Sequence, residues 1–164
     1  MKALVKSARG AGHMSIREVD EPAPGPGQVR VRVKWTGICG TDVHIASGAF
    51  FHYFPPLILG HEFSGEIDVL GEGVEGISVG DRVTAEPTKS SCGRCPHCAE
   101  GNYNRCDERD IAGVVSDGAF TNYVVTRAES IHRLPDSVSL KAGALVEPLA
   151  VCVHGLIEQC RLAE

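Results

Sequence analysis

Apolar and basic side chains alternate in the stretch Val29-Arg30-Val31-Arg32-Val33-Lys34-Trp35. This period of two residues predicts a β-strand that buries its valines and Trp35 and exposes its basic side chains. Residues Glu62–Val69 alternate in the same way, with Phe63 on the predicted buried face and Ser64 on the exposed one. Both stretches therefore predict strands with one face on a core and one face in water.

Shorter segments extend this pattern through the first 135 residues. The further predicted strands are Ala3–Lys6, Ile16–Val19, Arg82–Ala85, Ala119–Val125 and Ile131–Leu134. Short strands separated by Gly-rich and Pro-rich turns predict a mainly β fold, a small barrel. After Pro135 the pattern changes, and Ser139–Val146 and Leu149–Arg161 predict two helices, with Pro148 in the first turn of the second.

Composition limits the classes of function. The chain has 164 residues, and its hydrophobic content of 43% is enough for one domain with a core. A net charge of -5 gives no general attraction to phosphate backbones, so we expect no nucleic-acid partner. No apolar run approaches the ~20 residues needed to cross a bilayer, and Met1–Lys6 begins a strand pattern, not a signal peptide. We therefore expect a soluble cytoplasmic protein with no membrane partner.

Four cysteines lie close together in the pattern C-x2-C-x2-C-x7-C, at Cys92, Cys95, Cys98 and Cys106. Four thiolates at this spacing can form a tetrahedral shell around one zinc ion. Disulfides are the alternative, but the absence of a secretory signal and the presence of three further cysteines favour a metal. His97 lies between two of these cysteines, and we expect it to be a solvated loop residue.

A glycine-rich stretch imitates a dinucleotide-binding fingerprint. Gly71-Glu72-Gly73-Val74-Glu75-Gly76 matches G-x-G-x-x-G and follows a predicted strand. A functional fingerprint opens a helix that receives a pyrophosphate, whereas residues 77–83 predict a turn and another strand. We therefore interpret these glycines as turn residues.

Three other residues are candidate metal ligands although they are far apart in the sequence. Cys39 and His61 lie at predicted strand edges, and Glu147 lies in an otherwise apolar segment, where a carboxylate needs a partner such as a cation. Taken singly, they could instead be a buried thiol, a structural histidine and an exposed helix-cap charge. Cys152 and Cys160 are expected to be small core residues of a helix.

At these residues the chain resembles the zinc-dependent medium-chain dehydrogenases, in particular the sorbitol or polyol and threonine dehydrogenase-like branch. The motifs that carry the resemblance are the four-cysteine cluster, Gly37-Ile38-Cys39-Gly40-Thr41-Asp42-Val43-His44, Gly60-His61-Glu62-Phe63-Ser64-Gly65, Val79-Gly80-Asp81-Arg82-Val83 and Glu147-Pro148. The resemblance covers the whole chain and implies a GroES-like catalytic domain, a partly open β-barrel at residues 1–164. Within it, the family implies a structural zinc lobe at 88–110 and linking helices at 139–164.

The resemblance also implies roles for individual residues. Cys39 and His61 are similar to ligands of a catalytic zinc, and Glu147 stands where alcohol dehydrogenases have a second cysteine. Glu62 is similar to a family carboxylate that binds zinc directly or through a water, and Asp42 to the residue that fixes the ring of His61. The four clustered cysteines match a second, structural zinc site.

The family chemistry implies oxidation of a secondary alcohol or polyol to a ketone, with hydride transfer to NAD or NADP. Thr41 would take the proton of the substrate hydroxyl, and His44 would pass it to solvent. Alternatively, Thr41 caps a turn and His44 is a surface residue. The complete enzyme is expected to be a homo-oligomer.

The sequence also departs from the family. A nucleotide-binding domain of βαβ units is absent from this chain, so we hypothesise a fragment that binds zinc but does not oxidise alcohols on its own. Ile45 stands where sorbitol dehydrogenases usually carry an aromatic residue, which argues against polyol specificity. Phe50–Phe54 predicts either a loop near the substrate entrance, a plug under the barrel or a contact with the missing domain. The alternative function is a non-enzymatic zinc-stabilised GroES-like interaction module.

Overall fold

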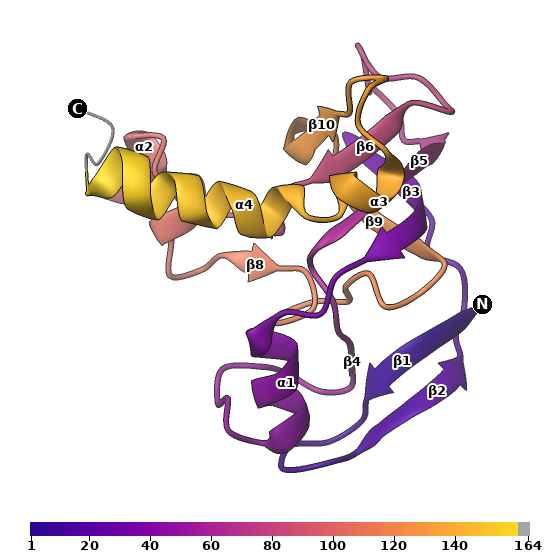
Figure 1. The fold of residues 1–164 in the computed structure, drawn as a ribbon, viewed down its shortest axis with the longest axis vertical. Helices are drawn as coiled ribbons and strands as arrows, with labels where there is room; N and C mark the ends of the chain where they lie inside the picture. Colours follow the sequence, from indigo (N-terminus) through magenta and orange to yellow (C-terminus); the bar gives the residue numbers. More distant parts are fainter. Residues whose placement is uncertain (161–164) are drawn as a thin grey trace.

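A computed structural model describes residues 1–160, apart from the side chain of Glu158 (Figure 1). The strands are β1 (Lys2–Lys6), β2 (Met14–Glu18), β3 (Gln28–Thr36), β4 (Leu57–Ile58), β5 (Phe63–Leu70), β6 (Arg82–Ala85), β7 (Thr88–Ser90), β8 (Asp110–Ile111), β9 (Tyr123–Arg127) and β10 (Ile131–Arg133). The helices are α1 (Gly40–Ser47), α2 (Pro96–Ala99), α3 (Leu140–Gly143), α4 (Val146–Val153), the 3-10 helices η1 (Tyr103–Arg105) and η2 (Ala128–Ser130), and the π-helix η3 (His154–Gln159). The prediction of a mainly β fold is confirmed.

The alternating strand β3 lies inside an antiparallel sheet of order β10-β6-β5-β3-β9. Val31 pairs with Ile67 on one side and with Val124 on the other, so apolar side chains of three strands meet on one face. Val31 is fully buried, and Ile67 and Val124 are each 2% exposed. This face forms the larger core, which also contains Phe63 and Val83.

A smaller sheet of order β2-β1-β4 lies beside the large one (Figure 1). The segment between β8 and β9 joins them: the Leu4 N–H donates to the Phe120 carbonyl at 2.9 Å, and Phe120 N–H donates to the Leu59 carbonyl at 2.9 Å. This segment was predicted as the start of a strand at Ala119, but β9 begins only at Tyr123. The strands thus form separate sheets bridged by loops, as expected for a partly open barrel.

Two details of the predicted strand faces are wrong. Trp35 is 47% exposed, because the register of β3 against β5 shifts between Val33 and Trp35 and turns the indole outward, where Lys141 Nζ lies 5.3 Å from the ring centroid. Ser64 is fully buried, because α3 covers that face of the sheet and the serine hydroxyl donates to the Leu140 carbonyl.

The interpretation of the glycine-rich stretch as a turn is confirmed. Gly73 and Gly76 have φ values of 75° and 74°, in the left-handed region that glycine adopts without strain. The Gly71 N–H donates to the Gln28 carbonyl at 2.8 Å, which closes the connection between β5 and β3. No helix begins here, and the chain continues into β6.

The helices differ more from their predicted boundaries. α3 is shorter than the predicted Ser139–Val146, α4 begins before the predicted Leu149, and Arg161 lies outside the described residues. α4 and η3 extend away from the sheets (Figure 1). Cys152 and Cys160 are consequently exposed, so their predicted role as core residues is wrong. Within the described part of the chain, no helix is long and apolar enough to cross a membrane.

Close backbone packing of glycines leads to a stability prediction. A Cβ at Gly118 would lie 2.0 Å from the Gly60 carbonyl oxygen. We expect Gly118→Ala to lower the free energy of unfolding by about 1–3 kcal/mol, because the two strand connections must separate. Urea unfolding followed by circular dichroism measures this. Gly40→Ala is the control, since a Cβ there meets no atom within 4 Å, and equal unfolding midpoints for the two variants would contradict the prediction.

Candidate metal centres

The first candidate centre begins at the N-terminus of α1. β3 ends at Thr36, and Cys39 is the residue that caps α1. The Cys39 N–H donates to Asp42 Oδ2 at 2.9 Å, and the Asp42 N–H donates back to the Cys39 carbonyl at 3.1 Å. An acidic residue at the third helical position is a typical start signal for a helix. This local structure fixes the position of the Cys39 backbone.

The second oxygen of Asp42 reaches the segment that precedes β5. Asp42 Oδ1 accepts the Gly60 N–H at 3.1 Å and lies 3.9 Å from His61 Nδ1. Asp42 is 3% exposed and His61 is 7% exposed, so this contact is shielded from water. Asp42 therefore joins the two segments that carry Cys39 and His61.

The ligand atoms of Cys39, His61 and Glu62 all lie within 4.8 Å of one another. Glu62 is 7% exposed, and its carboxylate lies over Gly37, where a Cβ would be 2.1 Å from Glu62 Oε2. Only glycine leaves this space open. Sequence reasoning missed this role of Gly37, although the residue was part of the quoted motif.

The donor set fits a zinc ion. A thiol, an imidazole and a carboxylate are the ligand types that zinc takes in proteins. His61 Nδ1 is buried and has no hydrogen-bond partner among the described residues, and such an atom is costly to leave unpaired. Asp42 faces this nitrogen, in the arrangement of a carboxylate that orients a metal-binding histidine, which leaves Nε2 for a metal.

Glu147 on α4 lies outside that group of ligand atoms, but it is electrostatically coupled to it. Burial raises the pKa of Glu147, while the charge of His61 lowers it and the charge of Glu62 raises it further. The Glu147 carboxylate therefore lies near enough to His61 and Glu62 to be affected by their charges. A bound cation would offset this concentration of negative charge.

The two predicted proton-relay residues lie on α1. Thr41 is half-buried, and its Oγ1 lies 3.7 Å from Cys39 Sγ. His44 is exposed on the same helix, and no hydrogen bond joins it to Thr41 among the described residues. The hydroxyl thus lies beside the candidate centre, while the imidazole lies in water.

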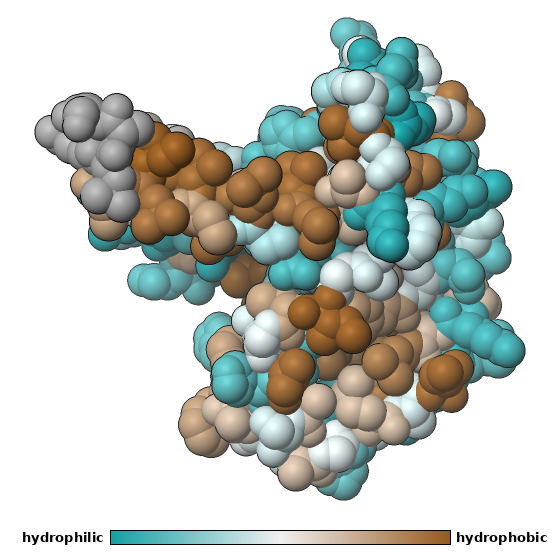
Figure 2. Space-filling model, viewed as in Figure 1, coloured by the Kyte–Doolittle hydropathy of each residue, from teal (hydrophilic) through white to brown (hydrophobic). Residues whose placement is uncertain are grey.

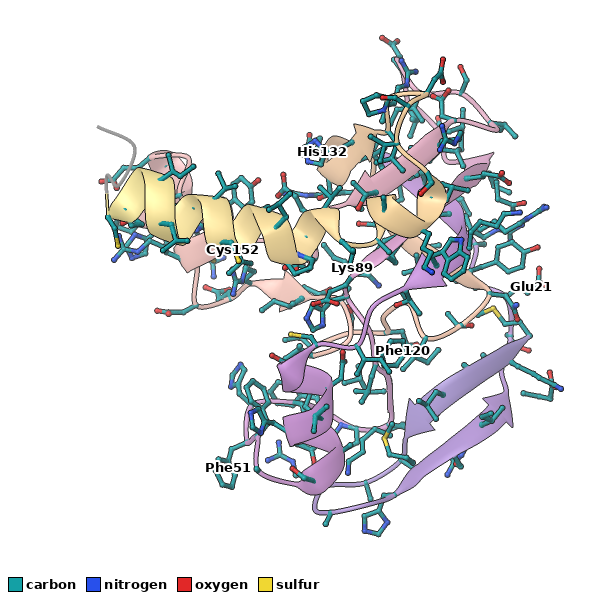
Figure 3. The ribbon with its side chains drawn as sticks, viewed as in Figure 1. Glu21, Phe51, Lys89, Phe120, His132 and Cys152 are labelled. Atoms are coloured by element: carbon teal, nitrogen blue, oxygen red, sulfur yellow. The ribbon has the colours of Figure 1, made fainter. Side chains whose placement is uncertain are left out.

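The aromatic run Phe50–Phe54 divides into two parts. Tyr53 is 2% exposed and packs in a core with Ile45, so this residue acts as a plug. Phe51 is 82% exposed at the outer edge of the loop beside α1 (Figure 3). Ile45 itself is fully buried, so in the described structure it presents no surface to a substrate.

The second candidate centre is the four-cysteine cluster. The thiol sulfurs of Cys92, Cys95, Cys98 and Cys106 lie within 4.8 Å of one another, and Cys92 Sγ lies 4.0 Å from Cys98 Sγ. Cys95 caps α2 and Cys106 follows η1, so two short helices bring the thiols together. All cysteines of the described residues are free thiols, which favours the predicted metal over disulfides.

Backbone donors favour thiolates in this cluster. The backbone N–H groups of Arg94 and Cys95 lower the pKa of Cys92 to about 7, and the Ser91 hydroxyl lowers the pKa of Cys98. For Cys95, the N–H of Cys98 lowers the pKa, but burial and hydrogen bonds to neighbouring thiols outweigh it and raise the pKa to about 11. Zinc binds the thiolate form of cysteine. The lowered pKa values of Cys92 and Cys98 therefore favour zinc binding by this cluster.

Polar contacts attach the cluster to the large sheet. The Tyr103 hydroxyl donates to Glu86 Oε2 at 2.5 Å, and Glu86 Oε1 lies 3.2 Å from His132 Nε2 on β10. The Arg127 guanidinium lies over the Tyr103 ring, with its Cζ 4.9 Å from the ring centroid. These contacts hold the 92–106 segment against β9 and β10.

Comparison with known proteins identifies the fold. Residues 25–136 match the alcohol dehydrogenase GroES-like domain. This chain belongs to that family. The matched region contains Cys39, His61, Glu62 and the four clustered cysteines, and the predicted resemblance to zinc-dependent medium-chain dehydrogenases is confirmed.

Relatives of this GroES-like domain are longer dehydrogenases. The chain is 52% identical to a sorbitol dehydrogenase of Halalkalibacterium halodurans, over 96% of this chain and 45% of that protein. It is 44% identical to an L-threonine 3-dehydrogenase of Pyrococcus horikoshii, again over 96% of this chain and 45% of that protein. A crystal structure of a zinc-binding dehydrogenase from Sinorhizobium meliloti bound to NADP aligns with a TM-score of 0.87 at 39% identity, over 94% of this chain and 44% of that one. The chain therefore spans less than half the length of these relatives.

The two centres predict a metal stoichiometry for this GroES-like domain. We expect two zinc ions per chain, one after Cys95→Ser and one after His61→Ala, because each substitution removes a ligand from one centre only. Elemental analysis after gel filtration in metal-free buffer measures the zinc content.

Lys2→Ala is the matched control, since Lys2 is exposed and belongs to neither candidate centre. A chain that binds one zinc ion, unaffected by His61→Ala, would contradict the first centre. That result would favour a zinc-stabilised interaction module.

Proposed function

We propose that this chain is the N-terminal zinc-binding catalytic domain of an NAD(P)-dependent dehydrogenase that oxidises a secondary alcohol or polyol to a ketone. The observation that carries the proposal is the convergence of half-buried Cys39 with buried His61 and Glu62, with Asp42 behind the imidazole. An interaction module has no need for a mixed set of a thiol, an imidazole and a carboxylate in addition to the four-cysteine cluster.

In this proposal Cys39 and His61 hold the catalytic metal together with a carboxylate, from Glu62 or Glu147. A bound zinc ion would supply a Lewis acid that polarises the substrate hydroxyl. Asp42 would hold the His61 ring in place through Nδ1. A bound cation would also stabilise the charged form of the Glu147 carboxylate, whose pKa is raised by burial.

Residues of α1 would carry the proton in this mechanism. The Thr41 hydroxyl lies beside Cys39 and would accept the proton that leaves the substrate oxygen. His44, exposed on the same helix, would deliver it to solvent. The hydride would pass to NAD or NADP, which carries that part of the chemistry.

The substrate class follows from the relatives. Sorbitol and L-threonine, the substrates that the names of two relatives indicate, both contain a secondary alcohol. We therefore favour a small secondary alcohol. Ile45 is buried and provides no aromatic surface for a sugar alcohol. We therefore propose a secondary alcohol in general and not a polyol in particular.

The 92–106 cysteines would hold a second zinc in a structural role. Four sulfur ligands complete a tetrahedral shell and leave no position for substrate. We propose that this structural zinc lobe comprises residues 88–110. The contacts of Glu86 with Tyr103 and His132 would then hold the lobe in a fixed position on the sheet.

The C-terminal helices support the proposal of a missing nucleotide-binding domain. Apolar side chains line the visible face of α4 in Figure 2. Leu149 is 61% exposed, Val151 62% and Leu156 54%. A helix with this much exposed apolar surface requires a partner surface. We propose that residues 139–164 link the catalytic domain to the rest of a longer protein, which covers this face.

Activity tests the catalytic proposal. We expect the 164-residue chain to oxidise no secondary alcohol in the presence of NAD or NADP, whereas a longer protein that includes a nucleotide-binding domain does. In that longer protein, His61→Ala should abolish activity to the detection limit of NADH or NADPH absorbance at saturating alcohol. Ile16→Ala is the control, because Ile16 is exposed and remote from the centre. Full activity of the His61→Ala variant would overturn the proposed mechanism.

Thermal unfolding tests the proposed role of α4. We expect Leu149→Asp to leave the melting temperature of the 164-residue chain nearly unchanged, since the side chain is 61% exposed there. In the longer protein the same change should cost about 2–4 kcal/mol, because a buried charge would replace an apolar contact. Val79→Asp is the matched control, because Val79 is 64% exposed in a turn of the sheet domain. Equal effects of Leu149→Asp in both proteins would contradict the linking role.

A further inference from the structure

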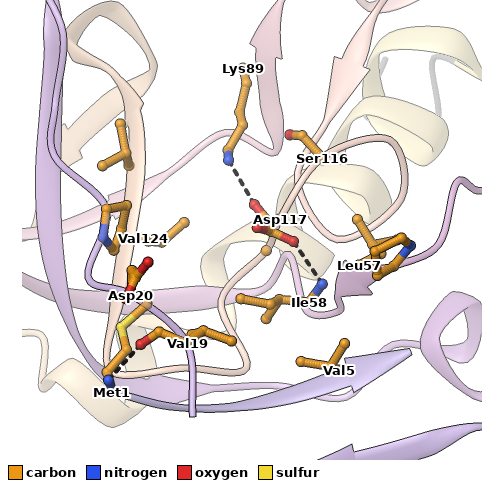
Figure 4. Close-up of a pocket in the computed structure, with 14 residues that line it drawn as sticks. Met1, Val5, Val19, Asp20, Leu57, Ile58, Lys89, Ser116, Asp117 and Val124 are labelled. Carbon is orange, nitrogen blue, oxygen red and sulfur yellow. Dashed lines mark hydrogen bonds between the residues drawn. The ribbon is translucent and has the colours of Figure 1, made fainter. Parts of the chain in front are cut away.

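A cavity of about 530 Å³ lies between the small sheet, β7 and β9 (Figure 4). Its walls are mainly aliphatic, with Val5, Leu57, Ile58 and Val124 among them. Neither group of candidate metal ligands contributes to the lining. The cavity thus shares no lining residue with either candidate metal centre.

Half-buried Lys89 brings an amine to the edge of this apolar space. Its Nζ donates to the Asp117 carbonyl at 2.6 Å, and Figure 4 shows the side chain extended toward that residue. A neutral amine also carries N–H donors, so this hydrogen bond positions the nitrogen without requiring its positive charge. The lone pair of the neutral form would remain available for reaction.

The surroundings of Lys89 favour the neutral form. Burial lowers the pKa of Lys89, and the charges of Asp110 and Asp117 raise it by less. An amine in an apolar pocket with a lowered pKa is a stronger nucleophile at neutral pH than an exposed lysine, because more of it is unprotonated.

Ser116 supplies a second polar group. It lines the same cavity, and its hydroxyl is buried without a hydrogen-bond partner among the described residues. A buried hydroxyl without a partner is costly, and an oxygen of a bound molecule could satisfy it. The cavity thus combines apolar walls, a nucleophilic nitrogen and a hydrogen-bond donor.

We propose that this cavity captures small aliphatic aldehydes as an imine on Lys89. The amine nitrogen attacks the carbonyl carbon, and the Ser116 hydroxyl donates to the carbonyl oxygen. That oxygen then leaves as water with the two amine hydrogens, and the C=N bond forms. The step needs no oxidant or reductant. The apolar walls hold the alkyl chain, and the carboxylates of Asp20 and Asp117, which also line the cavity, disfavour a negatively charged aldehyde.

Reductive trapping tests the proposal on the 164-residue chain. The protein is treated with butanal and sodium cyanoborohydride at neutral pH, and alkylated peptides are measured by mass spectrometry over time. We expect Lys89 to be modified at least about three times faster than exposed Lys2 and Lys141, because its lowered pKa leaves more of its amine unprotonated. Equal rates at the three lysines would overturn the proposal.

Variants separate the cavity from simple amine reactivity. Ser116→Ala should reduce the preference for Lys89, and Val19→Phe should abolish it by filling the cavity, with folding checked by circular dichroism. The preference should also vanish in denaturing urea and with glyoxylate in place of butanal. A preference that persists in urea would show that sequence context, not the cavity, is responsible, and would refute the inference.

Discussion

The carboxylate of Asp42 is the interaction on which the candidate catalytic centre depends. One oxygen accepts the N–H of Cys39, and the other accepts the N–H of Gly60 and faces His61. Hydrogen bonds of this charge-assisted kind are worth about 1.5–3 kcal/mol each. Because Asp42 is buried, the two contacts fix the distance between the segment after β3 and the segment before β5. The pairing of Thr36 with Phe63 brings the two segments together, and this carboxylate then holds Cys39 and His61 in position.

The two candidate centres are built in opposite ways. The four cysteines lie within the short segment 92–106, so little chain entropy opposes their convergence, and their thiols are mostly half-buried near the surface. Cys39 and His61 come from separate connections of the large sheet, and Glu147 from a helix more than 80 residues later. A local, sulfur-rich cluster suits a structural metal, whereas a mixed set that depends on the whole fold suits chemistry.

Much of the sheet was predictable because its strands bury one face only. Val31 and Ile67 follow the period of two, and the strand boundaries differ by one or two residues in most cases. The errors have tertiary causes: α3 covers Ser64, and a register shift turns Trp35 outward. The helix α1 was missed because its apolar residues show little periodicity, although Asp42 placed three residues after Cys39 was an available signal.

The candidate site was predictable in composition but not in arrangement. The spacing of the cysteines and the motifs around Cys39 and His61 identified the ligand types. The Glu62 carboxylate can approach Cys39 and His61 because Gly37 has no side chain. This contact depends on how the folded chain packs and cannot be inferred from the spacing of residues in the sequence. The exposure of Cys152 could not be predicted either, because an apolar helix without its partner has the same sequence as a buried one.

The order of the strands along the chain has a consequence for synthesis. Every strand of the large sheet has appeared by Arg133, and the apolar helix α4 begins only at Val146. A growing polypeptide can therefore complete the sheet, the Cys39–His61–Glu62 set and the cysteine cluster before the apolar helix leaves the ribosome. The exposed leucines and valines of α4 then emerge beside a domain that has already folded.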